Sequence, residues 1–385
     1  MLLASEPMEY GVLSYLERVF AGLDRSRVEP ALAYSPRRMA PQGRTLVDRL
    51  ARDGIRVCAL PFHRGIGRGD ATAAARLRAE VRAFGPDVVH LHSTKAGLIG
   101  RPIARSAGVR VLYTPHGTSW HYTGRVVGRL QLALERILRR LTDGLLAVCP
   151  EEAHAFVEEV GFPSARVRVI RNGVPLRSRT RLVAERRRAR ASLEVPDDET
   201  WAVFVGRLTH EKGLDVLLRA LEEPVGLGGL LVVGDGPERK ALEALATRAT
   251  LPVRFCGYHE DVSGFLAAAD VFVQPSRSEG LPFSLLEAMA HGLPVVCSDV
   301  GGMRAAVGDC GRVVPPDDPR TLAASLRRLA LDGETRRTVG EAARSRVARE
   351  FGVGRMIDAL HEAYAEACGL DPRSERPFVG SGEVA

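Results

Sequence analysis

The 385-residue sequence lacks the features that mark several common protein classes. Its longest run of apolar residues and glycine, residues 225–234, is far too short to cross a bilayer, and no basic leader of a signal peptide follows Met1. The six cysteines are scattered without paired spacing, which favours reduced thiols over a disulfide framework or a metal cluster. Aromatic residues make up only 5% of the chain and no nucleic-acid-binding motif is present. We therefore expect a cytoplasmic globular protein that does not bind nucleic acid.

Motifs for several nucleotide and metal sites are also missing. The chain contains no P-loop and no Gly-x-Gly-x-x-Gly fingerprint between a strand and a helix, which argues against a P-loop NTPase and a dehydrogenase. It has no Asp-x-Asp pair, and its histidines have no acidic partner at ligand spacing. We therefore expect neither a bound metal nor a cofactor.

Lysine is scarce, and the charge is unevenly distributed. Of the 54 basic residues, only Lys95, Lys212 and Lys240 are lysine. Residues 1–175 carry a net charge of +10, residues 176–190 carry +6, and residues 191–385 carry −9. A basic front half indicates an anionic partner such as a bilayer surface or a lipid-linked diphosphate. An ordinary arginine-rich surface explains the same charge equally well.

Short apolar strands alternate with amphipathic helices along the whole chain, which predicts a parallel α/β architecture. The length favours two domains. The predicted strands of the front half are Leu2–Ala4, Pro30–Tyr34, Val57–Leu60, Val88–His92, Arg110–Thr114, Leu145–Val148 and Val167–Ile170. Those of the back half are Ala202–Gly206, Leu230–Val233, Val253–Cys256, Val271–Gln274, Val295–Ser298 and Arg312–Val314. The last helices are predicted near residues 319–330, 334–350 and 353–368.

The segment from Glu279 to Glu287 reads Glu-Gly-Leu-Pro-Phe-Ser-Leu-Leu-Glu and lies between a predicted strand and a helix, residues 283–290. The first N–H groups of a helix have no partner within it and attract anions. Glu279 would precede that helix, and Glu287 would lie about 6 Å further along its axis. Two carboxylates flanking an anion site suit a nucleotide sugar, although each also suits an ordinary helix charge.

A second segment, from Trp201 to Gly213, runs from a buried strand through Gly206, Arg207 and Lys212 into a helix. Arginine binds phosphate through a planar fork, and lysine supplies a mobile positive charge. The pattern therefore favours a diphosphate site over a solvated basic loop.

These two segments occur in order with Gly234-Asp-Gly-Pro-Glu238, and together they resemble the family 4 retaining glycosyltransferases. The N-terminal segments around His92, His116 and Asn172 are similar to members that build exopolysaccharide repeats. The resemblance implies the GT-B fold: two Rossmann-like domains facing across a cleft, with a C-terminal helix crossing back to the N-terminal domain.

The resemblance also implies roles for individual residues. His116, Arg207, Lys212 and Glu279 correspond to catalytic residues of the family. The donor-binding residues that it implies are Gly11, Gly206, Gly280, Leu281, Pro282, Phe283 and Glu287. The family often has two glycines in the first loop, where this chain has Tyr10 and Gly11.

Ser93, Thr94 and Lys95 follow the strand that ends at His92. They are candidate acceptor contacts, and the alternative is simple capping of the next helix by the hydroxyl groups.

Five segments are expected. Residues 1–175 form an acceptor domain, 176–190 a basic linker, 191–352 a nucleotide-sugar-binding domain, 353–370 the crossover helix and 371–385 a disordered tail.

The expected activity is metal-independent, retaining transfer of a sugar from a UDP- or GDP-sugar to a hydroxyl acceptor. A polyprenyl-diphosphate-linked glycan is the favoured acceptor, with peripheral contact at the anionic inner face of the plasma membrane. A natural-product glycosyltransferase, a hydrolysing nucleotide-sugar epimerase and a non-catalytic nucleotide-sugar-binding protein remain alternatives.

Overall fold

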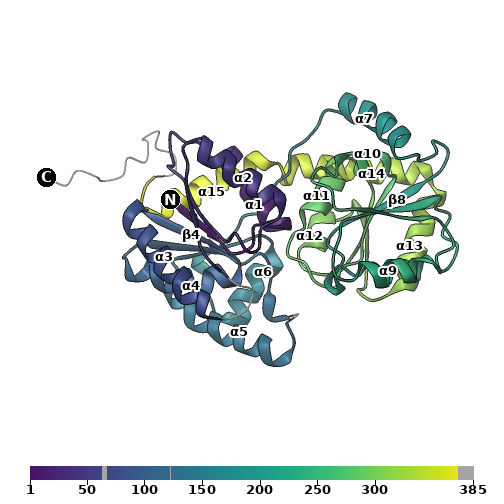
Figure 1. The fold of residues 1–385 in the computed structure, drawn as a ribbon. Coiled ribbons are helices and arrows are strands. Elements are labelled where there is room, and N and C mark those ends of the chain that lie inside the picture. Colours follow the sequence, from purple (N-terminus) through teal and green to yellow (C-terminus); the bar gives the residue numbers. More distant parts are fainter. Residues whose placement is uncertain (63–66, 122, 372–385) are drawn as a thin grey trace. The chain divides into compact units, whose positions relative to one another are not determined.

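The computed structural model describes residues 1–62, 67–121 and 123–371, and the chain divides into two compact units. Unit 1 comprises residues 1–171 together with the segment from Val353 onward, and unit 2 comprises Asn172–Gly352. Each unit is built on one parallel sheet covered by helices (Figure 1). The predicted tail, residues 371–385, lies outside the described residues apart from Asp371.

Unit 1 contains a seven-stranded parallel sheet in the order β3-β2-β1-β4-β5-β6-β7. Its strands are β1 (Leu2–Ser5), β2 (Ala31–Tyr34), β3 (Arg56–Ala59), β4 (Val88–His92), β5 (Arg110–Thr114), β6 (Gly144–Ala147) and β7 (Val167–Val169). The helices are α1 (Tyr10–Gly22), α2 (Pro41–Arg52), α3 (Arg68–Phe84), α4 (Ser93–Ser106), α5 (Arg125–Leu138), α6 (Pro150–Ala155) and α15 (Val353–Ala367). Short helical turns η1 (Ser119–His121), η2 (Arg139–Leu141), η3 (Phe156–Val160) and η4 (Ser164–Arg166) lie between them.

Unit 2 contains a six-stranded parallel sheet in the order β10-β9-β8-β11-β12-β13. Its strands are β8 (Trp201–Val205), β9 (Gly229–Val233), β10 (Val253–Gly257), β11 (Val271–Gln274), β12 (Val295–Ser298) and β13 (Gly311–Val314). The helices are α7 (Arg179–Ser192), α8 (Leu214–Ala220), α9 (Arg239–Ala246), α10 (Ser263–Ala268), α11 (Phe283–Ala290), α12 (Met303–Val307), α13 (Pro319–Leu331) and α14 (Gly333–Glu350), with the turn η5 (His210–Lys212).

The predicted strands are confirmed, each within one residue of its predicted bounds. The central strands are completely buried: β1 and β4 in unit 1, and β9 and β11 in unit 2. Such strands are continuous apolar runs because helices cover both faces of a parallel sheet. This simple pattern explains why the sequence located them so closely.

The C-terminal helix α15 belongs to unit 1, although it follows unit 2 in the chain. It packs on α1, and the Tyr364 hydroxyl lies 2.9 Å from Nδ1 of His90 in β4. The chain therefore crosses back to its first domain, as the resemblance implied.

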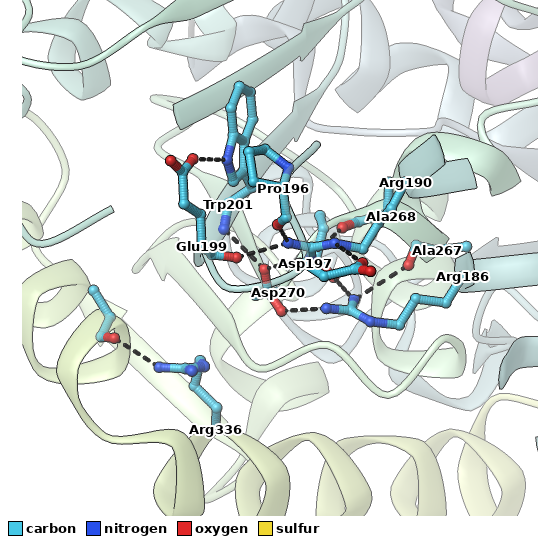
Figure 2. Close-up of polar contacts among 12 residues, drawn as sticks. Arg186, Arg190, Pro196, Asp197, Glu199, Trp201, Ala267, Ala268, Asp270 and Arg336 are labelled. Atoms are coloured by element: carbon cyan, nitrogen blue, oxygen red, sulfur yellow. Dashed lines mark hydrogen bonds and ion pairs between the residues drawn. The ribbon is translucent and has the colours of Figure 1, made fainter. Parts of the chain in front are cut away.

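The segment predicted as a basic linker is mostly helix α7, which is fastened to unit 2 (Figure 2). Arg186 and Arg190 share the carboxylate of Asp270, at N–O distances of 2.6 and 3.1 Å, and both also donate to carbonyls at the end of α10. The second Asp270 oxygen also accepts the Trp201 N–H at 2.8 Å. Through these contacts, the two arginines hold α7 beside the amino ends of β8 and β11.

Candidate functional site

In each unit, the strand order reverses at one point, and most of the predicted site residues follow the strands that flank it. The reversal falls between β1 and β4 in unit 1 and between β8 and β11 in unit 2. Loops that leave the carboxyl ends of two such strands diverge in opposite directions and leave room for a ligand. The two units are described separately below.

In unit 2, a short ion pair joins the two predicted segments. Lys212 Nζ lies 2.6 Å from Oε1 of Glu279. The same oxygen accepts hydrogen bonds from Ser276 Oγ at 2.7 Å and Gln274 Nε2 at 2.8 Å. Three donors on one carboxylate oxygen fix the orientation of Glu279 and leave its other oxygen for a further donor.

Two glycines allow these loops to approach so closely. Gly213 has φ +65°, and a Cβ there would lie 2.0 Å from the carbonyl oxygen of Pro275. Gly301 has φ +52°, and a Cβ there would lie 2.0 Å from the carbonyl oxygen of Glu279. A larger residue at either position would push the Lys212 loop or the Glu279 loop away, because both neighbours are main chain.

Helix α11 begins where the Glu279 loop ends. It spans Phe283–Ala290, as predicted, and Pro282 precedes it in extended conformation. Glu287 is four residues into the helix and is half-buried. The first turn of α11 therefore lies in sequence between the two predicted carboxylates, which is the arrangement expected of an anion site.

Sequence reasoning missed several residues that hold this site in place. Gln274 is completely buried, and its Oε1 accepts from Ser284 Oγ at 3.1 Å, which connects Glu279 to α11. Arg277 forms two 2.8 Å contacts with Asp215 and donates to the His210 carbonyl, which anchors the Lys212 loop. The sequence feature that could have revealed these residues is the polar run Gln-Pro-Ser-Arg, residues 274–277, which begins at the last residue of the buried strand β11.

In the sequence, Asn172 stands out only as part of a segment that resembles the family. In the structure, its side chain holds a loop of unit 2. Its Nδ2 donates to the carbonyl oxygen of Leu281 at 2.6 Å, and its side chain is buried. It therefore holds the main chain of the loop that leads into α11.

In unit 1, His116 belongs to a buried cluster of imidazole and phenol rings. His116 Nε2 lies 3.1 Å from Nδ1 of His92, and Tyr15 packs edge-on against His116 with 4.9 Å between ring centroids. His90 lies next to His92 and contacts Thr114 Oγ1 at 2.8 Å. His90 and His92 are fully buried, whereas His116 is partly exposed. His116 is thus the member of the cluster that a ligand can reach.

Burial keeps these histidines neutral. It lowers the pKa of His90 and of His116 to about 3, and the neighbouring His116 adds to the effect on His90. The pKa of His92 is also well below its usual value, first because of burial and then because of the two adjacent histidines. At neutral pH, His116 is therefore a neutral imidazole and not a cation.

The turn that carries His116 is held by a buried carboxylate. His116 has φ +61°, and Glu152 in α6 accepts the N–H of the following Gly117 and that of Val148. Burial raises the pKa of Glu152 to about 7, against the effect of these two backbone N–H groups. Nothing in the sequence distinguished Glu152 from the adjacent Glu151.

The three predicted acceptor residues differ in their surroundings. Lys95 forms an ion pair with Asp70 at 2.8 Å, and Thr94 Oγ1 donates to Ser119 Oγ at 3.2 Å. Ser93 has φ +72°, and its buried Oγ has no partner among the described residues. Of the three, Ser93 therefore has an unsatisfied hydroxyl, but a ligand would reach its buried Oγ only after a local rearrangement.

Tyr10 and Gly11, predicted to end the first βα loop, are the first two residues of α1. Tyr10 has φ +51°, in the left-handed region that glycine adopts most easily, and its side chain is exposed. A Cβ at Gly11 would meet no atom within 4 Å. The protein itself therefore gives no steric reason for glycine at position 11, which leaves close approach of a ligand as a reason for it.

Within the described ranges, no three His, Cys, Asp or Glu side chains are grouped so as to hold a metal ion. Over the same ranges, none of the helices is both long and apolar enough to span a bilayer.

Comparison with known proteins agrees with this arrangement. Residues 10–173 match the glycosyl transferase 4-like domain, and residues 199–332 match glycosyl transferases group 1. The chain is 34% identical over 313 residues to the D-inositol 3-phosphate glycosyltransferase of Saccharomonospora viridis, covering 73% of this chain and 70% of that protein. It is 29% identical over 285 residues to the putative teichuronic acid biosynthesis glycosyltransferase TuaC of Bacillus subtilis, covering 72% and 70%.

Among solved structures, Anabaena HepE in complex with UDP aligns with a TM-score of 0.78 and 20% identity, covering 95% of this chain and 99% of that one. This similarity shows the fold. Together with the relatives and the two matched domains, it establishes that the chain belongs to the glycosyltransferases of the family 4 type, with the GT-B fold.

Proposed function

We propose that the protein is a retaining glycosyltransferase that moves a sugar from a nucleoside-diphosphate sugar to a hydroxyl acceptor without a metal ion. The observation that carries the proposal is the Lys212–Glu279 pair at the β8/β11 reversal, directly before the N-terminus of α11. One group binds anions, the other binds hydroxyls, and a nucleotide sugar presents both.

In unit 2, Arg207 and Lys212 stabilise the charge that develops on the leaving diphosphate, and the first N–H groups of α11 assist them. Gly206 and the loop Gly280–Phe283 bring main chain against the donor. Glu279 accepts hydrogen bonds from hydroxyls of the sugar through its second carboxylate oxygen, Oε2. Glu287 accepts hydrogen bonds from the ribose hydroxyls.

In unit 1, neutral His116 hydrogen-bonds the transferred sugar, and Gly11 admits close approach of the substrate. Ser93, Thr94 and Lys95 contact the acceptor, with Thr94 and Lys95 exchanging or sharing their present partners. The resemblance to the family 4 enzymes implies front-face displacement, and we propose this route, in which a leaving-phosphate oxygen takes the acceptor proton.

The donor is proposed to be a UDP- or GDP-sugar. The solved relative HepE is described in complex with UDP and with UDP-glucose, which supports UDP as the first nucleotide to test. The acceptor is proposed to be a polyprenyl-diphosphate-linked glycan, used at the anionic inner face of the plasma membrane. The relation to TuaC supports a cell-surface polysaccharide over a natural product.

Calorimetric titration with UDP, GDP and their common sugars, all in EDTA, tests the donor site. We expect one nucleotide to bind, and Arg207→Ala and Glu287→Ala to weaken binding about tenfold or more. Arg328→Ala, an exposed arginine on α13, is the matched control. Absence of nucleotide binding by the folded protein would refute the proposed donor site. Binding only when a divalent ion is added would refute the proposal that no metal ion is needed.

Turnover distinguishes the reaction from its alternatives. With an acceptor present, NMR should show a product with the donor's anomeric configuration. Release of free nucleotide at the same rate without any acceptor would instead indicate a hydrolysing epimerase. Binding without turnover on any acceptor tested would indicate a nucleotide-sugar-binding protein.

A further inference from the structure

Helix α5 exposes a continuous apolar stripe at the surface of unit 1. Val126, Leu130 and Ile137 are 82%, 57% and 63% exposed, and Ala133 is also exposed. These residues have the spacing i, i+4, i+7 and i+11, which places them in one row along a helix. The row is about 16 Å long at 1.5 Å per residue.

The rotation of α5 about its axis is fixed, so this face is outward. Glu135, on the opposite side, forms two 2.8 Å hydrogen bonds with Arg101 of α4, and both side chains are buried. A Cβ at Gly128 would lie 2.3 Å from the Trp120 carbonyl oxygen, so the helix crosses η1 there in close contact. Turning the apolar row inward would break the ion pair and this crossing.

A row of arginines borders the apolar stripe. The row consists of Arg125, Arg129 and Arg136 in α5 and Arg140 in η2, the turn that directly follows it. Each precedes a residue of the apolar row by one position or follows one by three, so they lie along one flank. In the described part of the chain, Arg125, Arg129 and Arg140 form no ion pair, and Arg136 donates to the Glu159 carbonyl. The Glu159 carboxylate is bound to Trp120 and His121. The positive charge of this flank is therefore mostly uncompensated.

Helix α7 provides a contrast within the same molecule. It has six arginines, of which Arg181, Arg186 and Arg190 pair with Glu185 or Asp270. Its Arg187 and Arg188 form no ion pair in the described part of the chain. Val183 is its one strongly exposed apolar side chain among the described residues. Of these two helices as described, α5 is the one that combines a row of exposed apolar side chains with unpaired arginines.

We propose that α5 is the surface by which the protein binds an anionic lipid bilayer. The helix would lie in the plane of the interface, with the apolar row among the acyl chains and the arginines against the head groups, which is the pattern of interfacial amphipathic helices. This assigns a surface to the membrane contact proposed above, and it can fail while glycosyl transfer stands.

Charge complementarity favours a bilayer over a second copy of the chain. A symmetric pair of α5 helices would bring two arginine rows together, because a two-fold interface places each patch against itself. An anionic bilayer instead supplies opposite charge beside an apolar phase. The proposed occupant is therefore lipid, and self-association is an outcome that the test must detect.

Co-sedimentation of the full chain with vesicles tests the proposal. We expect binding to phosphatidylcholine vesicles containing one third phosphatidylglycerol, little binding to phosphatidylcholine alone, and weaker binding at high salt. The double substitution Leu130→Glu/Ile137→Glu should reduce partitioning about tenfold or more, and Arg129→Glu/Arg140→Glu should remove the preference for anionic vesicles.

Leu331→Glu on α13 and Val183→Glu on α7 are matched controls, because these side chains are 73% and 69% exposed on other helices. They should bind vesicles as the parent does. Circular dichroism and nucleotide titration of every variant report whether each is folded and whether the donor site is intact. Equal vesicle binding by parent and α5 variants would overturn the proposal. So would a dimer, seen by light scattering, that only the α5 variants lose.

Discussion

Glu279 is held by one of its two carboxylate oxygens. Lys212, Ser276 and Gln274 all contact Oε1 within 2.8 Å, and the side chain is only 8% exposed. Glu279 is therefore a fixed hydrogen-bond acceptor beside a cation, and little reorganisation is needed for the donor binding that we propose. The energetic cost of ordering these groups is met during folding.

Glu279→Gln should therefore separate sugar binding from nucleotide binding. We expect the affinity for the nucleotide sugar to fall about 10- to 100-fold, since a hydrogen bond to a charged group contributes roughly 1.5–3 kcal/mol. The affinity for the free nucleotide should change little. Calorimetry with both ligands measures the ratio, and an equal loss for the two would place Glu279 on the nucleotide instead of the sugar.

The buried pair Arg101–Glu135 acts at the scale of the element, since it joins α4 to α5. Arg101 Nη1 and Nη2 each donate to a different oxygen of Glu135 at 2.8 Å. Arg101 Nε donates to the Gly97 carbonyl, and the guanidinium lies 4.2 Å from the Tyr113 ring centroid. Burial of both charges is costly unless each is fully paired.

Arg101→Leu should destabilise unit 1 by about 3–5 kcal/mol, because it leaves the Glu135 carboxylate buried and unpaired. Adding Glu135→Leu should recover most of that loss, since two apolar side chains can replace the pair. Urea unfolding of the single and double variants measures the difference. If the double variant is as unstable as the single one, packing and not charge is the main contribution of these residues.

At the scale of the whole molecule, the chain provides one tryptophan in each unit. Trp120 lies in unit 1, Trp201 lies in unit 2, and both are buried. A variant that keeps only one of them reports the unfolding of one unit by fluorescence.

Nucleotide should stabilise the unit that binds it. In the Trp120→Phe background, a nucleotide at about 100 times its Kd should raise the stability reported by Trp201 by about 2.7 kcal/mol. In the Trp201→Phe background, the Trp120 transition should move less. A larger shift at Trp120 would assign the nucleotide site to unit 1 and refute the donor assignment.

Acid should destabilise unit 1 through its buried histidines. The folded-state pKa of His90 is lowered to about 3 by burial and by His116, so the unfolded chain binds more protons between about pH 6.5 and pH 3. Stability is therefore fully present above this window and is lost as the pH falls through it. Glu152 acts in the opposite sense, because its folded-state pKa is raised to about 7.

His90→Asn isolates the contribution of His90. In the Trp201→Phe background, this variant should lose about 2 kcal/mol less stability between pH 7 and pH 5 than its parent. His154→Gln, at an exposed histidine of the same unit, is the control for the effect of removing a histidine from the surface. An unchanged slope in His90→Asn would mean that His90 does not titrate differently in the folded and unfolded states.

The sequence by itself determined the strands and the residues at their carboxyl ends. Buried parallel strands are continuous apolar runs, so local composition is sufficient to locate them. A turn such as Glu279–Pro282 has few conformations available before a helix, so local composition also locates the turn. The order of the motifs then identified the family, because their spacing reflects one topology.

Only the tertiary structure decided which polar groups support the site. Gln274, Asn172 and Glu152 look ordinary in the sequence, and their roles come from contacts with residues 5 to 109 positions away. The exposure of the α5 stripe is also a tertiary result, because the Arg101–Glu135 pair sets which side of that helix faces outward. Periodicity gives the angle between residues on a helix, but packing against the rest of the fold decides which side is buried.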